Sequence, residues 1–550
     1  MIPEAAAVSA EVVSGQTRRP AILGRTIFDY ADDLTIQMPA SCLRSGRCHE
    51  CVVELIEGGD ALTAPTEPES FLRTPFRLAC QAVIERPTAV IEFKPLRRRL
   101  RIQMAGDELA ELGPTAPPDS PVRRLADGVT YDGTSLDINR GRALGLAVDV
   151  GTTTVVVELV DLEHGTVIGV GAFENPQAFG GSDVMNRISY DGRAPGELRR
   201  ALSRALNQEI RGLCHDLEVD RRMIYEAVIV GNATMRDCFF GIDLSPIGQR
   251  PYKSSIELEA LSGLRPTTGL TERAHSLGLW MHPQGFVVSP PLIASHVGAD
   301  MAADLVALDI ANLSGRWMLI DIGTNTEVVV SDGSRILAAS CPAGPAFEGG
   351  LVRYGMPGSE GAIERALLDG DVWRLKTIGN VPAEGICGSG LIDLLAELRR
   401  HDRMTPLGVF PERAKQVVIE PERGISLSRE DASNLAQAKA ANACGQAILL
   451  RHLGVQPADL DQVFLAGGFA NHIDVANAIT IGFLADVRAE RVTKIGNASI
   501  RGARLLLLSR ARRVALEGLV HRIQHIELET TPDFFELFVE ACQFKPMLAA

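Results

Sequence analysis

Cysteine, aromatic residues and long hydrophobic runs are all scarce in this chain. Cysteine fills only 10 of 550 positions, far below the density of a small disulfide-linked scaffold, and aromatic residues make up 5%. The leucine run at 505–508 is enclosed by Arg504 and Arg510, so it falls well short of the ~18 apolar residues that a membrane span requires. We therefore expect neither a disulfide framework nor a membrane protein.

Basic charge and targeting signals are also in short supply. The chain has 55 basic against 69 acidic residues, a formal charge of −14, which opposes broad attraction to nucleic acid or anionic lipid. Residues 1–20 lack both a basic start and a continuous apolar core, so we expect no secretory signal and a cytoplasmic protein. A hydrophobic content of 46% is ample for about two to four globular domains.

The few cysteines are unevenly placed. Cys42, Cys48 and Cys51 fall within ten residues, and Cys80 follows after a gap of 28. Structural zinc sites usually contain two close pairs, whereas a plant-type [2Fe–2S] ferredoxin uses C-x4-C-x2-C and a remote cysteine, which matches here with one residue added to the first gap. The spacing predicts a [2Fe–2S] cluster held by these four thiolates, with zinc or four unrelated thiols as alternatives. Since four thiolates complete the ligand set, we expect His49 to be a solvated neighbour.

The surrounding sequence agrees with a ferredoxin-like domain. Ile27, Phe28 and Ala31 recur at helical spacing before the cysteines, and residues 51–62 alternate as a half-buried strand does. The longer gap resembles the adrenodoxin-like branch of the ferredoxin family. Ser45 and Gly46 keep the loop small, which lets backbone N–H groups approach a cluster.

The composition and periodicity of the sequence then change twice. Residues 96–143 combine arginines and prolines with little periodicity, which predicts a linker. Apolar β-branched runs and helical patterns follow. We expect a ferredoxin-like domain at 1–95, the linker at 96–143, and the two halves of a second domain at 144–316 and 317–550.

That second domain contains an internal repeat. "GLAVDVGTTTVVVELVDL" at 145–162 and "WMLIDIGTNTEVVVSDG" at 317–333 superpose without gaps at an offset of 172 residues, the separation of Asp149 and Asp321. Two matching strand–turn–strand elements predict a duplicated α/β domain.

The chemistry of the repeated turn favours a polyphosphate. A glycine allows close backbone approach, and hydroxyl and N–H groups can surround phosphate oxygens. Asp149 and Asp321 suit an accompanying Mg²⁺, bound through waters. An ordinary β-turn is the alternative. The candidate phosphate-binding residues are Gly151, Thr152, Thr153, Thr154, Gly323, Thr324 and Asn325.

Two further glycine motifs complete a candidate nucleotide site. Gly467 and Gly468 follow a buried strand, where backbone without side chains could lie against adenine. Gly388 and Ser389 begin an amphipathic helix whose N-terminus could face the nucleotide. The chain has no G-x-x-x-x-G-K-[ST], which excludes a P-loop protein.

These motifs resemble the actin, sugar-kinase and Hsp70 superfamily, with 149–154 and 321–326 as its phosphate motifs and Gly467 and Gly468 as its adenosine motif. Together with the cysteines, "IVGNATM", "CPAGPAFEGG" and "ELETTPDFFELFVEACQF" resemble the reductive activators of corrinoid proteins. The resemblance implies an α/β protein in which a β-grasp [2Fe–2S] domain precedes an actin-like ATPase domain with RNase H-like halves.

The same resemblance implies a function. Such a protein uses ATP and Mg²⁺ to reduce inactive Co(II) in the corrinoid protein of a methyltransferase system to Co(I), with an electron from an external donor passing through the cluster, and works as a homodimer. Glu348 is a candidate for positioning the attacking water, although it could simply cap a helix. The alternatives are an actin-fold small-molecule kinase or ATPase with a redox-sensing iron–sulfur domain, and an electron carrier whose ATPase half has decayed.

Three departures from the family pattern lead to further expectations. Thr326 replaces a glycine of the second phosphate turn, which could alter its backbone, and the segment 355–364 lacks a usual arginine. Because the expected linker is short, we also expect the separate middle domain of some relatives to be reduced or missing.

Overall fold

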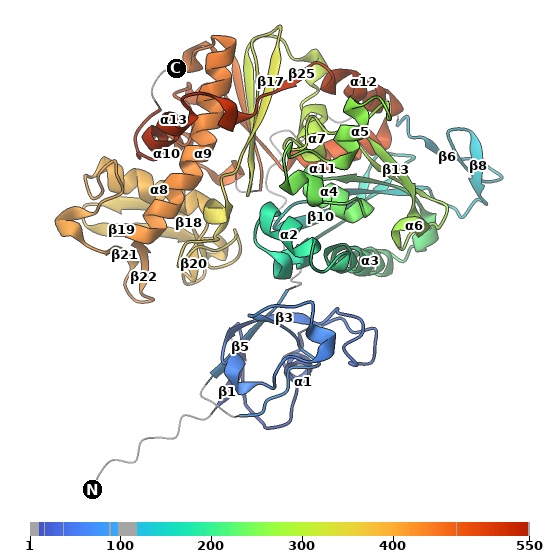
Figure 1. Ribbon diagram of the computed structural model, residues 1–550, viewed down its shortest axis with the longest axis horizontal. Coiled ribbons are helices and arrows are strands. Elements are labelled where there is room, and N and C mark those ends of the chain that lie inside the picture. Colours follow the sequence, from blue (N-terminus) through green and yellow to red (C-terminus); the bar gives the residue numbers. More distant parts are fainter. Residues whose placement is uncertain are drawn as a thin grey trace.

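The computed structural model describes residues 10–547 apart from 16, 37, 87–89, 97–117, 469 and the side chain of residue 311. Figure 1 shows a small N-terminal domain beneath two larger halves that stand side by side. No helix in this described part of the chain is both long and apolar enough to cross a membrane.

The N-terminal domain is a five-stranded sheet packed against one helix. Helix α1 (Ile27–Asp33) begins with a capping box in which Thr26 and Asp29 satisfy each other's backbone N–H groups. The predicted helix and the predicted strand after Cys51 are both present. The strand order is β2 (Thr17–Pro20), β1 (Glu11–Ser14), β5 (Val90–Pro95), β3 (Val52–Glu57) and β4 (Phe76–Leu78).

Part of the segment expected to be a linker is folded. Strands β6 (Val122–Arg124), β7 (Val129–Tyr131) and β8 (Thr134–Asp137) form an antiparallel sheet. The Tyr131 ring stacks on Phe286 at 3.8 Å, and its hydroxyl donates to Glu226 at 2.9 Å. These contacts attach the small sheet to the first large half. Residues 97–117 of the expected linker lie outside the described residues.

The first half is a six-stranded sheet with helices on its faces. Its central strand β9 is almost entirely buried, as expected for an apolar run covered on both sides. The strand order is β11 (Val167–Glu174), β10 (Thr154–Asp161), β9 (Leu144–Val150), β12 (Ile224–Val230), β14 (Phe286–Ser289) and β13 (Leu270–Arg273). The helices are α2 (Val184–Asp191), α3 (Glu197–Asp216), α4 (Ala233–Phe240), α5 (Ser255–Leu261), α6 (Ala274–Leu277) and α7 (Ala299–Ala307).

The second half repeats this plan and adds a smaller lobe. Its main sheet has the order β24 (Val492–Gly496), β23 (Gln462–Ala466), β15 (Trp317–Ile322), β16 (Thr326–Ser331), β17 (Ile336–Cys341) and β25 (Ile523–His525). The lobe contains β18 (Ala362–Asp369), β19 (Val372–Thr377), β20 (Gly385–Ile386), β21 (Gln416–Glu420) and β22 (Ile425–Ser428). The helices are α8 (Gly388–Arg400), α9 (Arg429–Leu453), α10 (Val475–Thr480), α11 (Ala498–Leu508), α12 (Arg510–Val520) and α13 (Phe534–Ala541).

Two of these helices cross back to the first half. Helix α11 packs against α7 and β9, and Leu505, Leu506 and Leu507 share a hydrophobic core with Ala147 and Val156. The leucine run that is too short for a membrane is therefore buried between the halves. In sequence, α11 and α12 lie between β24 and β25 of the second sheet, yet they pack against α7 of the first half, so a segment beyond the expected division at residue 317 covers the first sheet.

The repeated hairpins differ by one residue. Val150 pairs with Val155 in the first half, which leaves four residues in the turn, whereas Ile322 pairs with Thr326 in the second, which leaves three. The ungapped sequence match therefore does not extend to the pairing register. Thr326 begins β16 in an ordinary extended conformation, as Thr154 begins β10, so replacing glycine there leaves a regular strand.

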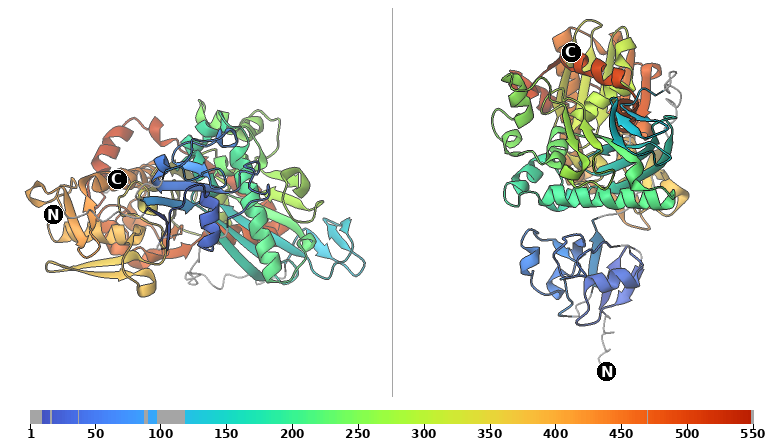
Figure 2. Two further views of the ribbon diagram at one scale, coloured as in Figure 1. Left: turned by 90° about the horizontal axis from the view of Figure 1, so that it is seen from below. Right: turned by 90° about the vertical axis from the view of Figure 1, so that its right-hand side faces the viewer.

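The ferredoxin-like domain is docked on the first half. The right-hand view of Figure 2 shows α3 running along the face that meets the N-terminal domain. The hydrophobic core is continuous across this boundary, since Cys51 and Leu96 belong to the same cluster of buried residues as Phe179, Tyr190 and Leu198. The docking face therefore excludes water, as a domain core does.

Candidate functional site: a paired cysteine loop and two facing turns

The four predicted cluster cysteines converge as two pairs. The thiol of Cys42 is paired with that of Cys48, and the thiol of Cys51 with that of Cys80. The pKa of the Cys80 thiol is lowered to about 6, chiefly because Cys51 donates a hydrogen bond to it. Two thiolates for each of two iron atoms is the arrangement that a [2Fe–2S] cluster requires. The donor set therefore fits this cluster.

A single zinc ion fits the site less well. The thiols lie as two pairs, Cys42 with Cys48 and Cys51 with Cys80. Structural zinc needs four such ligands at about 2.0–2.3 Å around a single centre. Two separate thiol pairs therefore favour a diiron cluster over zinc.

The cysteine loop is held in a tight, irregular path. Leu43, Arg44 and Gly46 all have positive φ, and a Cβ on Gly46 would lie 2.9 Å from Pro68. Only glycine meets both demands at position 46. Arg44 fastens the loop to α1, because its guanidinium donates to Asp29 at 3.1 Å and lies 4.1 Å above the Phe28 ring.

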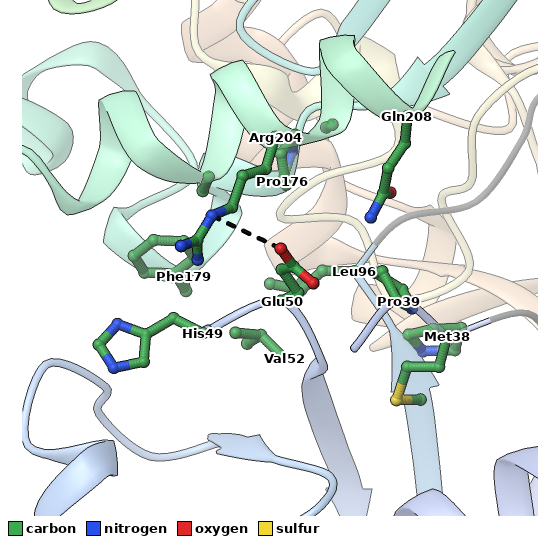
Figure 3. A pocket seen from close by; sticks show the side chains of 13 residues that line it. Met38, Pro39, His49, Glu50, Val52, Leu96, Pro176, Phe179, Arg204 and Gln208 are labelled. Carbon is green, nitrogen blue, oxygen red and sulfur yellow. Dashed lines mark ion pairs between the residues drawn. The ribbon is translucent and has the colours of Figure 1, made fainter. Parts of the chain in front are cut away.

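The expectation for His49 is wrong. Its ring stacks on Phe71 at 4.1 Å, and Nδ1 lies 3.1 Å from a carboxylate oxygen of Glu197 on α3. Figure 3 shows Glu50 pointing from the ferredoxin-like domain toward Arg204 of α3, with which it pairs, and His49 lying at the same boundary below Phe179. His49 is thus a docking residue, because the packed first half replaces the solvent that the sequence predicts around it.

The two predicted phosphate turns meet. The hydroxyl oxygens of Thr153 and Thr324 are 3.4 Å apart, and both hydroxyls donate to Oε2 of Glu348, at 2.9 Å and 2.5 Å. Glu348 ends the short helix η8 (Pro345–Glu348). Burial raises the pKa of its carboxyl group, against the two hydrogen bonds that lower it. The Glu348 carboxylate thereby joins two turns that lie 172 residues apart in the sequence, the separation of Asp149 and Asp321.

Asp149 and Asp321 lie at the strand ends beside these turns. Both keep some contact with solvent, yet dense protein surroundings raise the pKa of each carboxyl group to about 7. Nearby carboxylates add to the shift, with Asp300 acting on both. A cation would relieve this shared repulsion, so the two side chains suit the Mg²⁺ role predicted for them.

Further carboxylates at this site were not foreseen from the sequence. Asp300 and Asp304 on α7 and Glu327 on β16 all have raised pKa values, chiefly because of burial, and that of Asp300 reaches about 6. One oxygen of the fully buried Asp304 has no hydrogen-bond partner among the described residues. The four-residue spacing of Asp300 and Asp304 on an apolar helix was the available signal.

Two asparagines that orient the turns were also missed. Asn232 caps α4 and donates to the Thr152 hydroxyl at 3.1 Å, and Asn497 caps α11 and donates to Asp149 at 2.9 Å. The recurrence of Gly-Asn-Ala before a hydroxyl residue, at 231–234 and 496–499, could have revealed them.

The glycine motifs have different surroundings. Gly467, at φ 106°, lies so close to β15 that an added Cβ would be 2.2 Å from the Ile322 carbonyl oxygen, whereas the space around Gly468 is open. Gly467 therefore flanks the second turn. Ser389 is buried, and its hydroxyl donates to the Glu364 carbonyl at 3.0 Å. Gly388 is buried beside it at the start of α8, so this helix end is packed against the lobe.

The remaining turn residues take part through their backbones. The N–H of Gly151 donates to the Thr154 carbonyl at 3.0 Å, and that of Gly323 to the Asn325 carbonyl at 3.2 Å. These bonds close both turns. The side chain of Thr153 is the exposed one in the first turn, so its hydroxyl is available on the side where the turns face each other.

A ferredoxin-like domain docked on a duplicated fold with two facing turns defines a class, the iron–sulfur proteins with an actin-like ATPase-type domain. Comparison with protein families agrees. Residues 13–85 match a "2Fe-2S iron-sulfur cluster binding domain", 144–313 a "RACo middle region", and 316–549 the "C-terminal domain of RACo the ASKHA domain". The chain belongs to the family of reductive activators of corrinoid proteins.

Individual relatives carry matching names. The chain is 31% identical to "Corrinoid activation enzyme RamQ" of Eubacterium limosum over 431 residues, 73% of this chain and 70% of the relative. It is 23% identical to "[Co(II) methylated amine-specific corrinoid protein] reductase" of Methanosarcina barkeri, over 72% of this chain and 76% of that one. A solved structure named "Reductive activator for corrinoid,iron-sulfur protein" is 27% identical, covers 98% of both chains and has a TM-score of 0.68.

One expectation about the family is overturned. The match of residues 144–313 to the middle region shows that this region is present. It coincides with the half that carries the first phosphate turn. The shortness of the linker was a misleading signal, because the middle region begins only after it.

Proposed function

We propose that this protein activates a corrinoid protein of a methyltransferase system by reducing its inactive Co(II) to Co(I), in a reaction that depends on ATP. The observation that carries the proposal is that one chain combines two cysteine pairs on a docked ferredoxin-like domain with two phosphate turns joined through Glu348. Membership of the corrinoid-activator family supports the choice of substrate.

Cys42, Cys48, Cys51 and Cys80 are the residues that would hold the [2Fe–2S] cluster, which when bound supplies a one-electron carrier. The chain itself shields three of the four thiols from bulk water, although the loop between them is largely exposed. Cys48, Cys51 and Cys80 are buried, and the His49 ring lies between Phe71 and α3.

The facing turns would bind the phosphates of ATP from both sides. Thr153 and Thr324 offer hydroxyls, the turn N–H groups add donors, and Asp149 and Asp321 would orient the waters around Mg²⁺. The Glu348 carboxylate would accept a proton from the attacking water. Its raised pKa supports this role, because burial makes the carboxylate a stronger base than an ordinary glutamate.

Coupling between ATP binding in the cleft between the two halves and the reduction of Co(II) is energetically reasonable. An allosteric coupling of ~1–3 kcal/mol corresponds to about 40–130 mV for one electron. Closing the two halves around ATP could therefore shift an unfavourable reduction by about one to two powers of ten. We propose that this closure changes the surface that docks the corrinoid protein.

An optical experiment tests the proposal. The cluster is reconstituted without oxygen, and the protein is mixed with a Co(II) corrinoid protein and a reductant, with and without ATP. We expect the Co(I) absorption band to appear much faster with ATP. Cys80→Ser and Glu348→Gln are matched controls, since the first removes a proposed cluster ligand and the second the proposed base, and each leaves the other site intact. Equal rates without ATP contradict the coupling, and phosphorylation of a sugar or small acid would instead favour the kinase alternative.

Two parts of the proposal rest on family resemblance. An external donor would supply the electron, and the protein would form a homodimer. The molecular mass of the purified protein in solution tests the second, and reduction of the bound cluster by candidate ferredoxins or flavoproteins tests the first.

A further inference from the structure

The backbone of the first phosphate turn is tied to a neighbouring segment at three consecutive carbonyls. The Gly151 carbonyl accepts from the side chain of Asn175 at 2.8 Å, and the Thr153 carbonyl from its backbone N–H at 2.7 Å. The Thr152 carbonyl accepts from the guanidinium of Arg187 at 2.7 Å. The turn therefore cannot move without moving Asn175 and Arg187.

Arg187 lies on α2 and is almost fully buried, at 2% exposure. Among the described residues it forms no salt bridge. Its guanidinium donates instead to the Gly181 carbonyl at 3.0 Å and the Gln177 side chain at 3.3 Å. Burying an unpaired charge is costly, and its pKa is lowered to about 10 by desolvation. Packing alone does not explain a charge here, whereas fixing several carbonyl groups at once does.

The same contacts reach the face that holds the ferredoxin-like domain. Asn175 and Gln177 belong to the short helix η4 (Pro176–Gly180) and its cap, and η4 also carries Phe179. The Phe179 ring meets Phe71 edge-on at 5.8 Å, and the Tyr190 hydroxyl donates to the Phe71 carbonyl at 2.5 Å. Figure 3 shows Phe179 above His49 at this boundary.

Phe71 then leads directly to the cysteine loop, because its ring stacks on His49 at 4.1 Å. His49 stands next to Cys48 in the sequence. Hydrogen bonds, the backbone of η4 and ring contacts thus join the turn carbonyls to the cluster loop. The members of this series of contacts, in order, are Thr152, Arg187, Gln177, Phe179, Phe71 and His49.

A phosphate chain bound between the two turns must displace the first turn, where this series of contacts begins. The hydroxyl oxygens of Thr153 and Thr324 are only 3.4 Å apart, and both are bonded to Glu348. A phosphate group cannot enter that space unless the two turns separate. Movement of the first turn would carry Arg187 and η4 with it and alter the contact between Phe179 and Phe71.

We propose that Arg187 is a positioning residue that couples the first phosphate turn to the docking of the ferredoxin-like domain, so that nucleotide binding loosens this docking. The inference rests on the proposed function, since it requires a nucleotide between the turns. Loosened docking would free the cysteine loop to approach the corrinoid partner.

Hydrogen exchange of the full-length, cluster-loaded protein tests the coupling. Exchange is measured by mass spectrometry with and without Mg²⁺ and a saturating non-hydrolysable ATP analogue. We expect faster exchange in residues 66–73 and 176–190 when the analogue is bound, by roughly 5- to 150-fold, the usual range of coupling between two sites. No change at this face in protein that binds the analogue overturns the inference.

Two arginine variants isolate the route. Arg187→Met removes the bonds to the turn, and the nucleotide response of residues 66–73 is expected to vanish. Arg204→Met is the matched control, because Arg204 contacts Glu50 across the same boundary at 3.6 Å and makes no bond to the turn among the described residues. It should raise exchange in the absence of nucleotide but keep the response. An Arg187→Met protein that responds like the control overturns the inference.

If Arg187→Met does not fold, Phe179→Leu tests the coupling between the first turn and the docked domain instead. This change cuts the ring contact to Phe71 without touching the turn. Since coupling is reciprocal, a protein that docks weakly should bind the analogue more tightly than wild type. Unchanged affinity, measured by calorimetry, contradicts the proposal. Wild-type protein that does not bind the analogue at all would instead refute the proposed ATP dependence, so the two failures are distinguishable.

Discussion

The two phosphate turns are nearly identical in sequence and differ in almost everything around them. The first is held by Asn175 and Arg187, which bond to the turn and adjoin the helix η4 whose Phe179 meets the ferredoxin-like domain. The second is closed by the Gly344 N–H, which donates to the Thr324 carbonyl at 2.8 Å, and is flanked by Gly467. Duplication therefore supplied two similar turns that are predicted to bind phosphate, and the packing around each one determines what its movement affects.

This difference suggests that the two turns have different roles. Movement of the first turn can reach the docked domain, whereas movement of the second is transmitted to the strand end that Gly467 covers. Glu348 belongs to both, because it accepts a hydroxyl hydrogen bond from each turn. Substitutions can test whether the turns are interchangeable or distinct.

The largest effect is expected where the turns are joined. Glu348→Gln keeps the shape of the side chain but removes its capacity to accept a proton, so ATP hydrolysis should fall by about 100- to 10,000-fold. Nucleotide affinity should change little, because the amide oxygen can still accept from Thr153 or Thr324. Steady-state phosphate release and calorimetry measure the two quantities. Hydrolysis at the wild-type rate would exclude Glu348 as the base.

Changing the two aspartates compares the turns directly. Asp149→Asn and Asp321→Asn should each weaken binding of MgATP by about 10- to 100-fold, as expected for groups that act through metal-bound water. Both changes should also raise the stability of the metal-free protein, because burial and the charge of Asp300 raise the pKa of each carboxyl group. Titrations with ATP and EDTA provide the control, in which both variants should match wild type.

A pair of glycine substitutions tests how tightly each turn is closed. A Cβ at Gly151 would lie 2.6 Å from the Thr154 carbonyl oxygen, whereas a Cβ at Gly323 would lie 3.2 Å from that of Asn325. Gly151→Ala should therefore cost about 1–3 kcal/mol of stability, and Gly323→Ala less. Chemical denaturation followed by circular dichroism measures both. A larger loss in Gly323→Ala would reverse the comparison.

The smallest effect concerns the capping asparagines. Asn232→Ala and Asn497→Ala should each cost ~1 kcal/mol through loss of a helix cap. They should differ in pH dependence, because Asn497 alone donates to Asp149.

The sign of this pH effect follows from the raised pKa of Asp149. Burial raises this pKa from 3.8 to about 7, so the folded protein keeps a proton that the unfolded chain releases, and stability falls as pH rises through that window. Asn497→Ala removes a bond that favours the charged form, so the fall should extend to higher pH. Urea unfolding without Mg²⁺ or nucleotide, measured across pH 4 to about 8, detects the shift. The same profile in both variants would contradict it.

Much of the fold was predictable because its signals are local. The helix at Ile27, the strand after Cys51 and the repeated strand–turn–strand elements were expected from spacing and periodicity, and the structure contains them. Family comparison confirms the iron–sulfur domain and the actin-like fold. The one-residue difference between the hairpins was not predictable, because register depends on how each turn packs.

The candidate site was predictable only in part. The turn threonines were expected to bind phosphate, and the roles of these residues and of Glu348 stay predictions. No sequence signal indicated that Glu348 would join the turns. It lies in a glycine-rich segment, where a glutamate that merely caps a helix would look the same. Arg187 and Asn175 were missed, because a buried arginine on an amphipathic helix looks in sequence like one on the solvent side.

The sequence by itself determined the cysteine spacing, the duplicated turns and the apolar strands that deliver them, because these patterns act over a few residues. The tertiary structure alone decided which thiols pair, that His49 packs at a docking face, and that Arg187 connects that face to the first turn. Each of these contacts joins segments far apart in the chain. Their formation depends on the packing of the whole molecule, which no short stretch of sequence encodes.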